Sequence, residues 1–361
     1  MGAVRVRALT VALLIFAMLI LALAPFERAA AQDFPSRPVR FVVPYAAGGS
    51  GDLLARLLGN KLASIWGQQV VVDNRPGAGG LIGTEFAAHS EPDGYTLYLA
   101  TDGPLTIAAT LYKRVPYDWK RDFAPVSMLA MGYQVLLVGR SLAAQNVQEL
   151  IALARQKPGE LNYASIGIGS APHLGAELFK AVAKVDITHV PYRGSSAQAI
   201  TALIAGDVSM FLVGTSTAVP YIQNGAVRGL AVTSGYRVQG LPQVPTFAEA
   251  GLPGVDVSIW FAVLVPDGTP APIVRKLGAD IAQVQECFGS ARLRGSIERA
   301  RAIGGFLGQR LRQVSRSHPA ARPAGGMTWR RGCPQAHAGY LRPGWRRSER
   351  GMIYVQYEMA C

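Results

Sequence analysis

The chain has 361 residues, of which 50% are hydrophobic, and a formal net charge of +13. This length fits two modest domains. A basic protein often binds nucleic acid or membranes. Here, however, residues 284–361 hold 14 arginines against four glutamates, and residues 1–31 hold three arginines against one glutamate. The body between them, residues 32–283, is nearly neutral, so composition gives no reason to expect a nucleic-acid partner.

The first 31 residues have the pattern of a secretory signal peptide. Arg5 and Arg7 precede an uncharged, apolar run at residues 8–24, and three alanines end at Ala31. A positive start, an apolar stretch and a small-residue site predict cleavage after Ala31 and a periplasmic location. The alternative is an uncleaved anchor, but 17 apolar residues are at the short limit for spanning a bilayer.

The C-terminal segment, residues 284–361, differs from the body. It contains all three cysteines, has little hydrophobic periodicity after about Leu311, and carries repeated Arg-Pro and Arg-Arg clusters. One interpretation is a disordered basic tail. The preferred hypothesis is that the coding frame was lost near Val284, which leaves open that the protein is a non-functional remnant of a binding protein.

Strand and helix patterns alternate through the first part of the body. Short β-branched and aromatic runs predict strands, and apolar residues at helical spacing predict helices. The predicted strands are residues 39–43, 69–72 and 95–101, and the predicted helices are residues 52–62 and 81–88. Repeated β-α-β units of this kind favour a parallel, doubly wound α/β sheet.

A second alternating series begins after Gly132. Strands are predicted at residues 135–138, 161–166, 187–190, 208–213 and 229–233, and helices at 147–156, 173–183, 197–205 and 218–224. The apolar segments 135–141 and 260–266 look alike and predict two crossover strands. Lobe 1 would then comprise residues 32–132 and 254–283, and lobe 2 residues 133–253. In such sheets ligands bind beyond the carboxyl ends of the strands, here in the cleft between the lobes.

The loop between the first strand and the first helix is a candidate anion site. Gly48, Gly49 and Gly51 allow close approach of the backbone, and Ser50 or Asp52 can cap the helix. Backbone N–H groups at a helix N-terminus attract anions. Asp52 suits a cap or a loop organiser better than a direct ligand, because its charge repels an anion. The alternative is an ordinary capped turn.

A second glycine-rich turn, residues 74–83, resembles a dinucleotide fingerprint without meeting its requirements. Gly77, Gly79 and Gly83 have the right spacing, and Asp102 follows about twenty residues later. Residues 73–76 separate the strand from the glycines, so the tight first turn of that motif is missing. We therefore expect no nucleotide cofactor.

The loops of the second series combine glycines, hydroxyls and histidines. Ser170 and His173 raise the alternative of a secreted serine-type hydrolase, but no Gly-x-Ser-x-Gly motif is present and no acid partner can be assigned. We expect His173 to bond locally and His189 to be a core histidine. The three histidines of the body show no metal-ligand spacing.

Eight segments of the body form an ordered set. They are Pro35-Ser-Arg-Pro38, Val43-Pro-Tyr-Ala-Ala-Gly-Gly-Ser-Gly-Asp52, Val72-Asp-Asn-Arg-Pro-Gly-Ala-Gly-Gly80, Pro92-Asp-Gly-Tyr-Thr96, Asn162-Tyr-Ala-Ser-Ile-Gly-Ile-Gly-Ser170, His189-Val-Pro-Tyr-Arg-Gly194, Leu230-Ala-Val-Thr233 and Pro245-Thr-Phe-Ala-Glu-Ala-Gly251. Over about residues 33–283 this set resembles the tripartite tricarboxylate transporter substrate-binding family, also called the Bordetella uptake gene family. The segment after residue 283 does not resemble the amphipathic C-terminal helices of that family.

The resemblance implies a periplasmic binding protein of type II-like, Venus flytrap architecture. Such a protein is not an enzyme and has no cofactor or metal. It closes as a monomer on a small carboxylate-bearing solute and presents the solute to membrane transporter subunits. The implied ligand-binding residues are Tyr45, Ala46, Gly48, Gly49, Ser50, Asp52 and Thr101 in lobe 1, and Ser165, Gly167, Ser170, His173, Tyr192 and Gly194 in lobe 2.

Overall fold

The computed structural model describes residues 34–288, 341–347 and 353–359. The chain divides into two compact units, residues 1–308 and 309–361. In the second unit, β10 (Leu341–Arg347) and β11 (Ile353–Met359) form an antiparallel pair. The predicted signal peptide, and the tail apart from residues 284–288, β10 and β11, lie outside the described residues.

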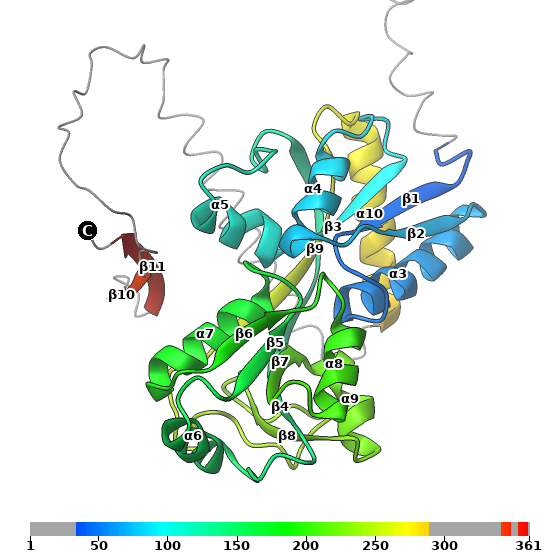
Figure 1. Cartoon of the computed structure of the whole chain (residues 1–361). Coiled ribbons are helices and arrows are strands. Elements are labelled where there is room, and N and C mark those ends of the chain that lie inside the picture. Colours follow the sequence, from blue (N-terminus) through cyan, green and yellow to red (C-terminus); the bar gives the residue numbers. More distant parts are fainter. Residues whose placement is uncertain (1–33, 289–340, 348–352, 360–361) are drawn as a thin grey trace, which may run out of the picture. The chain divides into compact units, whose positions relative to one another are not determined.

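The first unit holds a mixed sheet in two lobes, with the order β2-β1-β3-β9-β4-β7-β5-β6 and with β8 paired to β4 (Figure 1). We call lobe 1 the half that contains β1, β2, β3 and β9, together with residues 123–133 of β4. Its elements are β1 (Val39–Val43), α3 (Ser50–Trp66), β2 (Val70–Asn74), the 3-10 turn η1 (Ala78–Gly80), α4 (Leu81–Ala88), β3 (Thr96–Thr101), the π-helical turn η2 (Gly103–Ile107), α5 (Ala108–Leu111), β4 (Phe123–Gly139), β9 (Ser258–Pro266) and α10 (Ala271–Phe288).

Lobe 2 is the half that pairs with the rest of β4. Its elements are α6 (Val147–Gln156), β5 (Asn162–Ser165), α7 (Ala171–Ala183), β6 (Thr188–Pro191), α8 (Ser196–Ala205), β7 (Met210–Gly214), α9 (Thr215–Gln223) and β8 (Val227–Val232). In each lobe, hydrophobic clusters pack on both faces of the sheet, against helices on either side. The predicted two-lobed α/β architecture is therefore confirmed.

Strand directions refine that prediction. β1 runs parallel to β2 and β3, and β5 runs parallel to β6 and β7, as β-α-β units require. By contrast, β9 is antiparallel to β3 and β4, and β4 is antiparallel to β7 and β8. The strands at the centre of the molecule thus make the sheet mixed.

The connection between the lobes is longer than the sequence predicted. The predicted strand at residues 135–138 is only the second half of β4, whose first half pairs with β9 from Phe123 to Tyr133. Pro125 and two register shifts interrupt the alternation there, which explains why the pattern gave no signal. The chain crosses between the lobes after Tyr133 and again just before Ser258.

One hydroxyl links the two crossings. The backbone N–H of Gln134 in β4 donates to Thr233 Oγ1 over 2.9 Å, and the same hydroxyl donates to the carbonyl of Val257 over 2.6 Å. Thr233 is buried and follows directly after β8. The two connections therefore meet at a single side chain.

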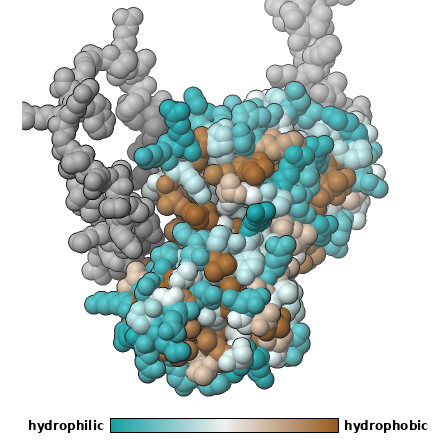
Figure 2. Space-filling view, in the orientation of Figure 1, coloured by the Kyte–Doolittle hydropathy of each residue, from teal (hydrophilic) through white to brown (hydrophobic). Residues whose placement is uncertain are grey.

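Helix α10 continues for five residues past the expected boundary at residue 284. Val284 is buried in the core of lobe 1, and the side-chain amide of Gln285 donates to the carbonyls of Met128 (2.8 Å) and Leu129 (3.2 Å). The segment that packs on the body thus includes the first residues of the predicted tail. Hydrophobic residues appear on the visible face of both lobes and between them, interspersed with hydrophilic ones (Figure 2).

Candidate functional site

A small cavity of about 60 Å³ lies between the lobes. Lobe 1 contributes residues from the loop after β1, the end of β3 and the face of β9, and lobe 2 contributes the starts of its helices. The lining residues are Tyr45, Gly49, Ser50, Gly51, Asp52, Thr101, Asp102, Gln134, Ile166, Ala171, Pro172, Ser196, Val213, Gly214, Thr217, Ile259 and Phe261. This volume holds only a few water molecules, so the lobes are closed upon each other.

Four helix N-termini face this cavity. Its lining includes the first residues of α3, α7, α8 and α9, each of which begins where a strand or strand-end loop finishes. The first turn of a helix has N–H groups without intrahelical partners, and the helix dipole places partial positive charge there. The cavity is therefore surrounded by donors that favour an anion.

Only two of these helices are capped by side chains. Ser170 Oγ accepts from the N–H of His173 at the start of α7, and Ser195 Oγ accepts from the N–H of Gln198 at the start of α8. Helices α3 and α9 begin after Gly49 and Gly214, which have no side chain to cap them. The donors left for a ligand are thus concentrated on α3 from lobe 1 and α9 from lobe 2.

The two uncapped helices meet across the cleft. Ser50 Oγ lies 2.9 Å from Thr217 Oγ1, and Ser216 Oγ donates to Ser50 Oγ over 2.8 Å. Sequence reasoning missed the α9 side of this contact. The signal was present in Gly214-Thr-Ser-Thr217, which follows the predicted strand 208–213 and repeats the strand, small residues, helix pattern of the first loop.

The loop at the start of α3 is held from inside by Asp52. Its carboxylate accepts from the N–H of Gly48 (2.9 Å) and pairs with Arg56 one turn later (3.0 Å). Burial opposes ionisation, but the hydrogen bonds from Arg56 and Gly48 outweigh it and lower the pKa of Asp52. The negative charge of Asp52 is therefore balanced before any ligand binds.

A second carboxyl, Asp102, lines the cavity without such a partner. It follows β3 and accepts from backbone N–H groups, and burial raises its pKa to about 7. Tyr45 lies in the same region, where its hydroxyl donates to the carbonyl of Gly79 (3.3 Å) and is 3.5 Å from Thr101 Oγ1. Among the described residues that line the cavity there is no lysine, arginine or histidine.

The lobe 2 hydroxyls named from the sequence are used within lobe 2. Ser165 Oγ lies 2.6 Å from His189 Nε2 and accepts from the N–H of Gly167 (3.0 Å). Ser170 Oγ donates to the carbonyl of Gly167 over 2.6 Å. Both serines are fully buried and lie behind the cavity wall.

These contacts remove the geometric basis of the hydrolase alternative. His173 Nδ1 faces the N–H of Gly169 at 3.4 Å, while Ser170 bonds to backbone atoms, so the two do not form a nucleophile and base pair. The serine that does contact an imidazole, Ser165, is fully buried. His189 stacks on Tyr163 with ring centroids 4.8 Å apart and lies 4.7 Å from the ring of His173.

The closed arrangement depends on glycines where the lobes touch. The N–H of Ala46 donates to the carbonyl of Gly194 across the cleft (3.0 Å), and the hydroxyl of Tyr112 donates to the carbonyl of Ile168 (3.2 Å). A Cβ atom added at Gly79 would collide with that same Ile168 carbonyl oxygen. These contacts exist only while the lobes are together.

The thirteen candidate residues therefore fall into three groups. Five line the cavity: Tyr45, Gly49, Ser50, Asp52 and Thr101. Ala46 and Gly194 bond across the cleft, and Gly48 braces the first loop. The remainder lie behind the lobe 2 wall and organise it: Ser165, Gly167, Ser170, His173 and Tyr192.

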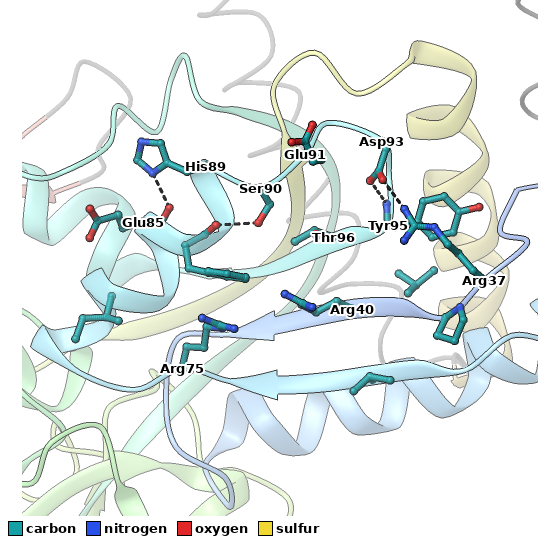
Figure 3. Close-up of a pocket in the computed structure, with 15 residues that line it drawn as sticks. Arg37, Arg40, Arg75, Glu85, His89, Ser90, Glu91, Asp93, Tyr95 and Thr96 are labelled. Carbon is teal, nitrogen blue, oxygen red and sulfur yellow. Dashed lines mark hydrogen bonds and ion pairs between the residues drawn. The ribbon is translucent and has the colours of Figure 1, made fainter.

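A larger, open depression of about 850 Å³ lies on the outside of lobe 1 (Figure 3). Its arginines have partners: Arg37 pairs with Asp93 (2.7 Å), Arg40 lies 3.9 Å from Asp73, and Arg75 pairs with Asp73 (2.8 Å) while stacking on Phe86 (3.4 Å to the ring centroid). No free donor set converges there as it does between the lobes. We therefore take the cleft as the candidate site.

Other classes of site find no support in the part of the chain that the structure describes. No three His, Cys, Asp or Glu side chains within it are grouped so that they could hold a metal ion. None of its helices combines the length and hydropathy needed to cross a bilayer.

Comparison with known proteins agrees with this geometry. The chain is similar to the "UPF0065 protein in tcbD-tcbE intergenic region" of Pseudomonas sp. (strain P51), with 44% identity over 249 residues that cover 69% of this chain and 74% of that protein. The solved structure "R. palustris Rpa4515 with adipate" is 36% identical, with a TM-score of 0.70 and coverage of 79% of this chain and 96% of that one. MatC from Rhodopseudomonas palustris with bound malate is 32% identical, with a TM-score of 0.69 and coverage of 78% and 98%.

The family match extends over most of the described body. Residues 54–287 match the tripartite tricarboxylate transporter family receptor, and this span runs from α3 through α10. It includes the starts of α7, α8 and α9 that form the lobe 2 face of the cleft. The chain therefore belongs to the tripartite tricarboxylate transporter receptor family.

Proposed function

We propose that this protein captures a small carboxylate-bearing solute between its lobes and delivers it to the membrane subunits of a tripartite tricarboxylate-type transporter. The observation that carries the proposal is the meeting of two uncapped helix N-termini, α3 and α9, across the cleft. Family membership and the adipate and malate in two similar structures support the same class of solute. The protein acts by binding alone, without catalysis.

The proposed carboxylate lies between Gly49–Asp52 on one side and Gly214–Thr217 on the other. Orphan N–H groups of both helices and the hydroxyls of Ser50 and Thr217 supply its hydrogen bonds. Each helix N-terminus contributes about 0.3–1 kcal/mol to an exposed anion and up to about 2 kcal/mol in a partly buried geometry. Two such ends, together with charge-assisted hydrogen bonds, hold a carboxylate without a cationic side chain.

Solute binding is coupled to closure. The carboxylate contacts come from both lobes, so the solute binds the closed form better than the open form and shifts the population toward it. The closed cavity of about 60 Å³ is smaller than an ordinary ligand site. The lobes must therefore separate to admit the solute. With the solute bound, they stay further apart than in this closed structure.

The remaining parts of the proposal follow from the family and the sequence. The chain is exported by its N-terminal segment, works in the periplasm as a monomer, and needs no cofactor. The predicted cleavage after Ala31 is checked by N-terminal sequencing of protein secreted to the periplasm. Analytical ultracentrifugation with and without solute checks the monomer.

The direct test is a thermal-shift screen against mono-, di- and tricarboxylates, followed by calorimetry of the members that bind. A solute present at 100 times its Kd stabilises the folded state by about 2.7 kcal/mol, which is readily detected. Glucose serves as the uncharged control. Absence of a shift with every carboxylate would reject the proposal.

Substitution at Gly49 tests the site itself. Gly49→Asp places a carboxylate at the N-cap of α3, where it satisfies the N–H groups and repels an anion, so binding falls at least about 30-fold, or about 2 kcal/mol. The nearest atom to an added Cβ is Ser196 Oγ at 3.5 Å, so the fold accepts it. Gly49→Ala is the size control and retains most of the affinity. Equal effects of the two variants would contradict an anion site at this helix.

A further inference from the structure

Exposed apolar side chains lie on both sides of the line where the two lobes meet, outside the cavity. Ile82 of α4, in lobe 1, is 52% exposed, and Ile168, in the loop that precedes α7 of lobe 2, is 48% exposed. Neither side chain lines the cavity between the lobes. The proposed solute site therefore leaves both without a role.

Contacts across the cleft place the two isoleucines on one seam. An added Cβ at Gly194 of lobe 2 would be 3.5 Å from the N atom of Gly77, and an added Cβ at Gly77 would meet the side chain of Ile82. Two residues further along the same turn, Gly79 lies against the carbonyl oxygen of Ile168. Ile82 and Ile168 thus flank one short turn of lobe 1.

The end of α5 extends the seam on the other side of Ile168. The hydroxyl of Tyr112 donates to the carbonyl of Ile168 (3.2 Å), and an added Cβ at Gly169 would be 3.4 Å from Leu111 Cδ2 and from the ring of Tyr112. In Figure 1, α4 and α5 lie above the seam, and α7 and α8 lie below it. We call Ile82, Leu111, Tyr112 and Ile168 the seam patch.

Basic side chains border the seam patch at both ends. Arg193 precedes Gly194, and Lys113 and Arg114 follow Tyr112; all three basic residues are exposed. Within the described part of the chain none of the three forms an ion pair, unlike the arginines of the outer depression. The border of the patch therefore offers positive charge that the protein itself does not neutralise.

This pattern favours a partner with the opposite charge. Single exposed apolar residues are ordinary, but a contiguous apolar set with a polar rim is typical of an interaction surface. Glu85 is exposed one turn after Ile82 and offsets part of the charge, but acidic side chains of a partner would still pair with the basic border and steer the encounter. The halves of the patch belong to different lobes, so a partner that contacts both binds the closed form better than the open form.

We propose that the seam patch is the docking surface for the membrane subunits of the transporter. The partner segment lies outside the membrane, with apolar side chains that cover Ile82 and Ile168 and acidic side chains that pair with Arg193 and with Lys113 or Arg114. This inference rests on the proposed delivery of solute to those subunits and adds the surface through which delivery occurs. Closure on the solute completes the surface, so the membrane subunits distinguish a loaded protein from an open, empty one.

Charge reversal tests the basic border. The full-length protein, with the panel carboxylate that raises its Tm most, is titrated onto the purified membrane subunits of the same bacterium's tripartite tricarboxylate-type transporter in phosphatidylcholine nanodiscs. We expect the wild type to bind at least about fivefold more tightly with the carboxylate than without it, and Arg193→Glu to weaken the loaded complex at least about tenfold.

The matched control is Arg140→Glu. Arg140 is also an exposed arginine of lobe 2 that forms no ion pair among the described residues. Its neighbour Gly139 lies against Leu203 near the C-terminal end of α8, whereas the N-terminus of that helix faces the cleft. We expect this variant to change docking by less than about twofold.

A serine substitution tests the apolar centre. Ile168→Ser weakens docking at least about fivefold, because it removes apolar surface that the partner covers. Ile204→Ser is the matched control: Ile204 is 45% exposed and lies near the C-terminal end of α8, so docking stays within about twofold of the wild type. Thermal unfolding and solute calorimetry of every variant report folding and solute capture separately from docking.

Four results would overturn the inference. Docking of wild-type strength by both Arg193→Glu and Ile168→Ser places the surface elsewhere and leaves the proposed function standing, and equal docking of the wild type with and without the carboxylate removes the link to closure. Binding to subunit-free phosphatidylglycerol nanodiscs that Arg193→Glu abolishes assigns the patch to anionic lipid. A wild type that captures the carboxylate but never binds the membrane subunits rejects this surface together with the delivery step, while solute capture stands.

Discussion

The two faces of the cleft are built by different means. On the lobe 2 face, buried serines hold the backbone in place: Ser165, Ser170 and Ser195 each bond to neighbouring atoms of their own lobe. On the lobe 1 face, α3 begins at a glycine and the loop before it is braced by the ion-paired Asp52. A hydroxyl in a strand-to-helix loop can therefore bond within the loop instead of to a ligand.

The difference also separates residues that set affinity from residues that set stability. On the lobe 1 face and at α9, donors are left free, and changes there should alter binding. On the rest of the lobe 2 face, donors are already used, and changes there should alter folding first. Three experiments test this division, and they differ in the size of the effect expected.

Among these three experiments, the largest loss of affinity is expected from Gly79→Ala. Its Cβ would collide with the Ile168 carbonyl oxygen of the other lobe, but only in the closed form. We expect affinity for the best-binding carboxylate to fall at least about tenfold, or about 1.4 kcal/mol. Calorimetry gives the affinity, and small-angle scattering with solute reports whether the lobes still close.

The matched control is Gly67→Ala. Gly67 has φ 64° and ψ 11°, close to the φ 66° and ψ 17° of Gly79, but nothing lies within 4 Å of an added Cβ. Both variants carry the same backbone cost, roughly 1–2 kcal/mol for a left-handed residue with a side chain. If Gly67→Ala weakens binding as much as Gly79→Ala, backbone strain rather than closure explains the loss.

A second effect, on stability instead of affinity, is expected from Ser165→Ala. The change leaves the imidazole of His189 and the N–H of Gly167 without a partner in a buried region. Such a loss costs about 1–3 kcal/mol, and each kcal/mol lowers the Tm of a domain this large by about 2–4 °C. Scanning calorimetry measures the shift, while solute affinity changes little.

Ser216→Ala is the companion variant, because Ser216 is exposed and its hydroxyl bonds only to Ser50 at the rim. We expect it to leave the Tm within about 1 °C of the wild type, as surface substitutions usually do. A Ser165→Ala protein with normal Tm and lost binding would instead make Ser165 a ligand contact.

The third effect is a dependence of stability on pH. Burial and the neighbouring His173 lower the pKa of His189 from 6.5 to about 4, with Glu177 and Lys180 also near the ring. The unfolded chain then binds a proton at His189 that the folded chain does not. The free energy of unfolding therefore decreases as the pH falls from about 6.5 towards about 4.

The titration of Asp102 changes the free energy of unfolding in the opposite direction. Its pKa is raised from 3.8 to about 7, so the folded chain holds a proton that the unfolded chain has released, and stability decreases as the pH rises through that interval. Urea unfolding of the wild type, His189→Asn and Asp102→Asn at several pH values between 4 and 7 measures the free energy of unfolding of each. The differences between them separate the contribution of His189 from that of Asp102. A wild-type minus His189→Asn difference that does not change with pH would contradict the assignment.

Much of the fold could be predicted from local sequence patterns. Strand and helix periodicities gave the alternating units of both lobes, and the glycine loop at residues 48–51 marked the start of α3. The first half of β4 was missed because Pro125 and two bulges break its alternation. The turn η2 and helix α5 were missed because Gly103-Pro104 looks like the start of a loop.

The contacts within the candidate site were harder to predict from the sequence, for a physical reason. The sequence shows that Ser165 and Ser170 follow a strand, but not which atoms their hydroxyls meet. Gln134 is a single polar residue in an apolar strand and belongs to no motif, yet the crossing of β4 between the lobes brings it to the cleft. Contacts made by chain segments far apart in sequence cannot be inferred from spacing.

The hydroxyl of Thr233 has a mechanical consequence. It accepts from Gln134 in one connection and donates to Val257 in the other, so neither connection can twist without pulling on its neighbour. We therefore expect the two connections to move together as one hinge instead of bending independently. Because solute release requires the lobes to separate, we expect this buried hydroxyl, which does not line the cavity, to influence the rate of release.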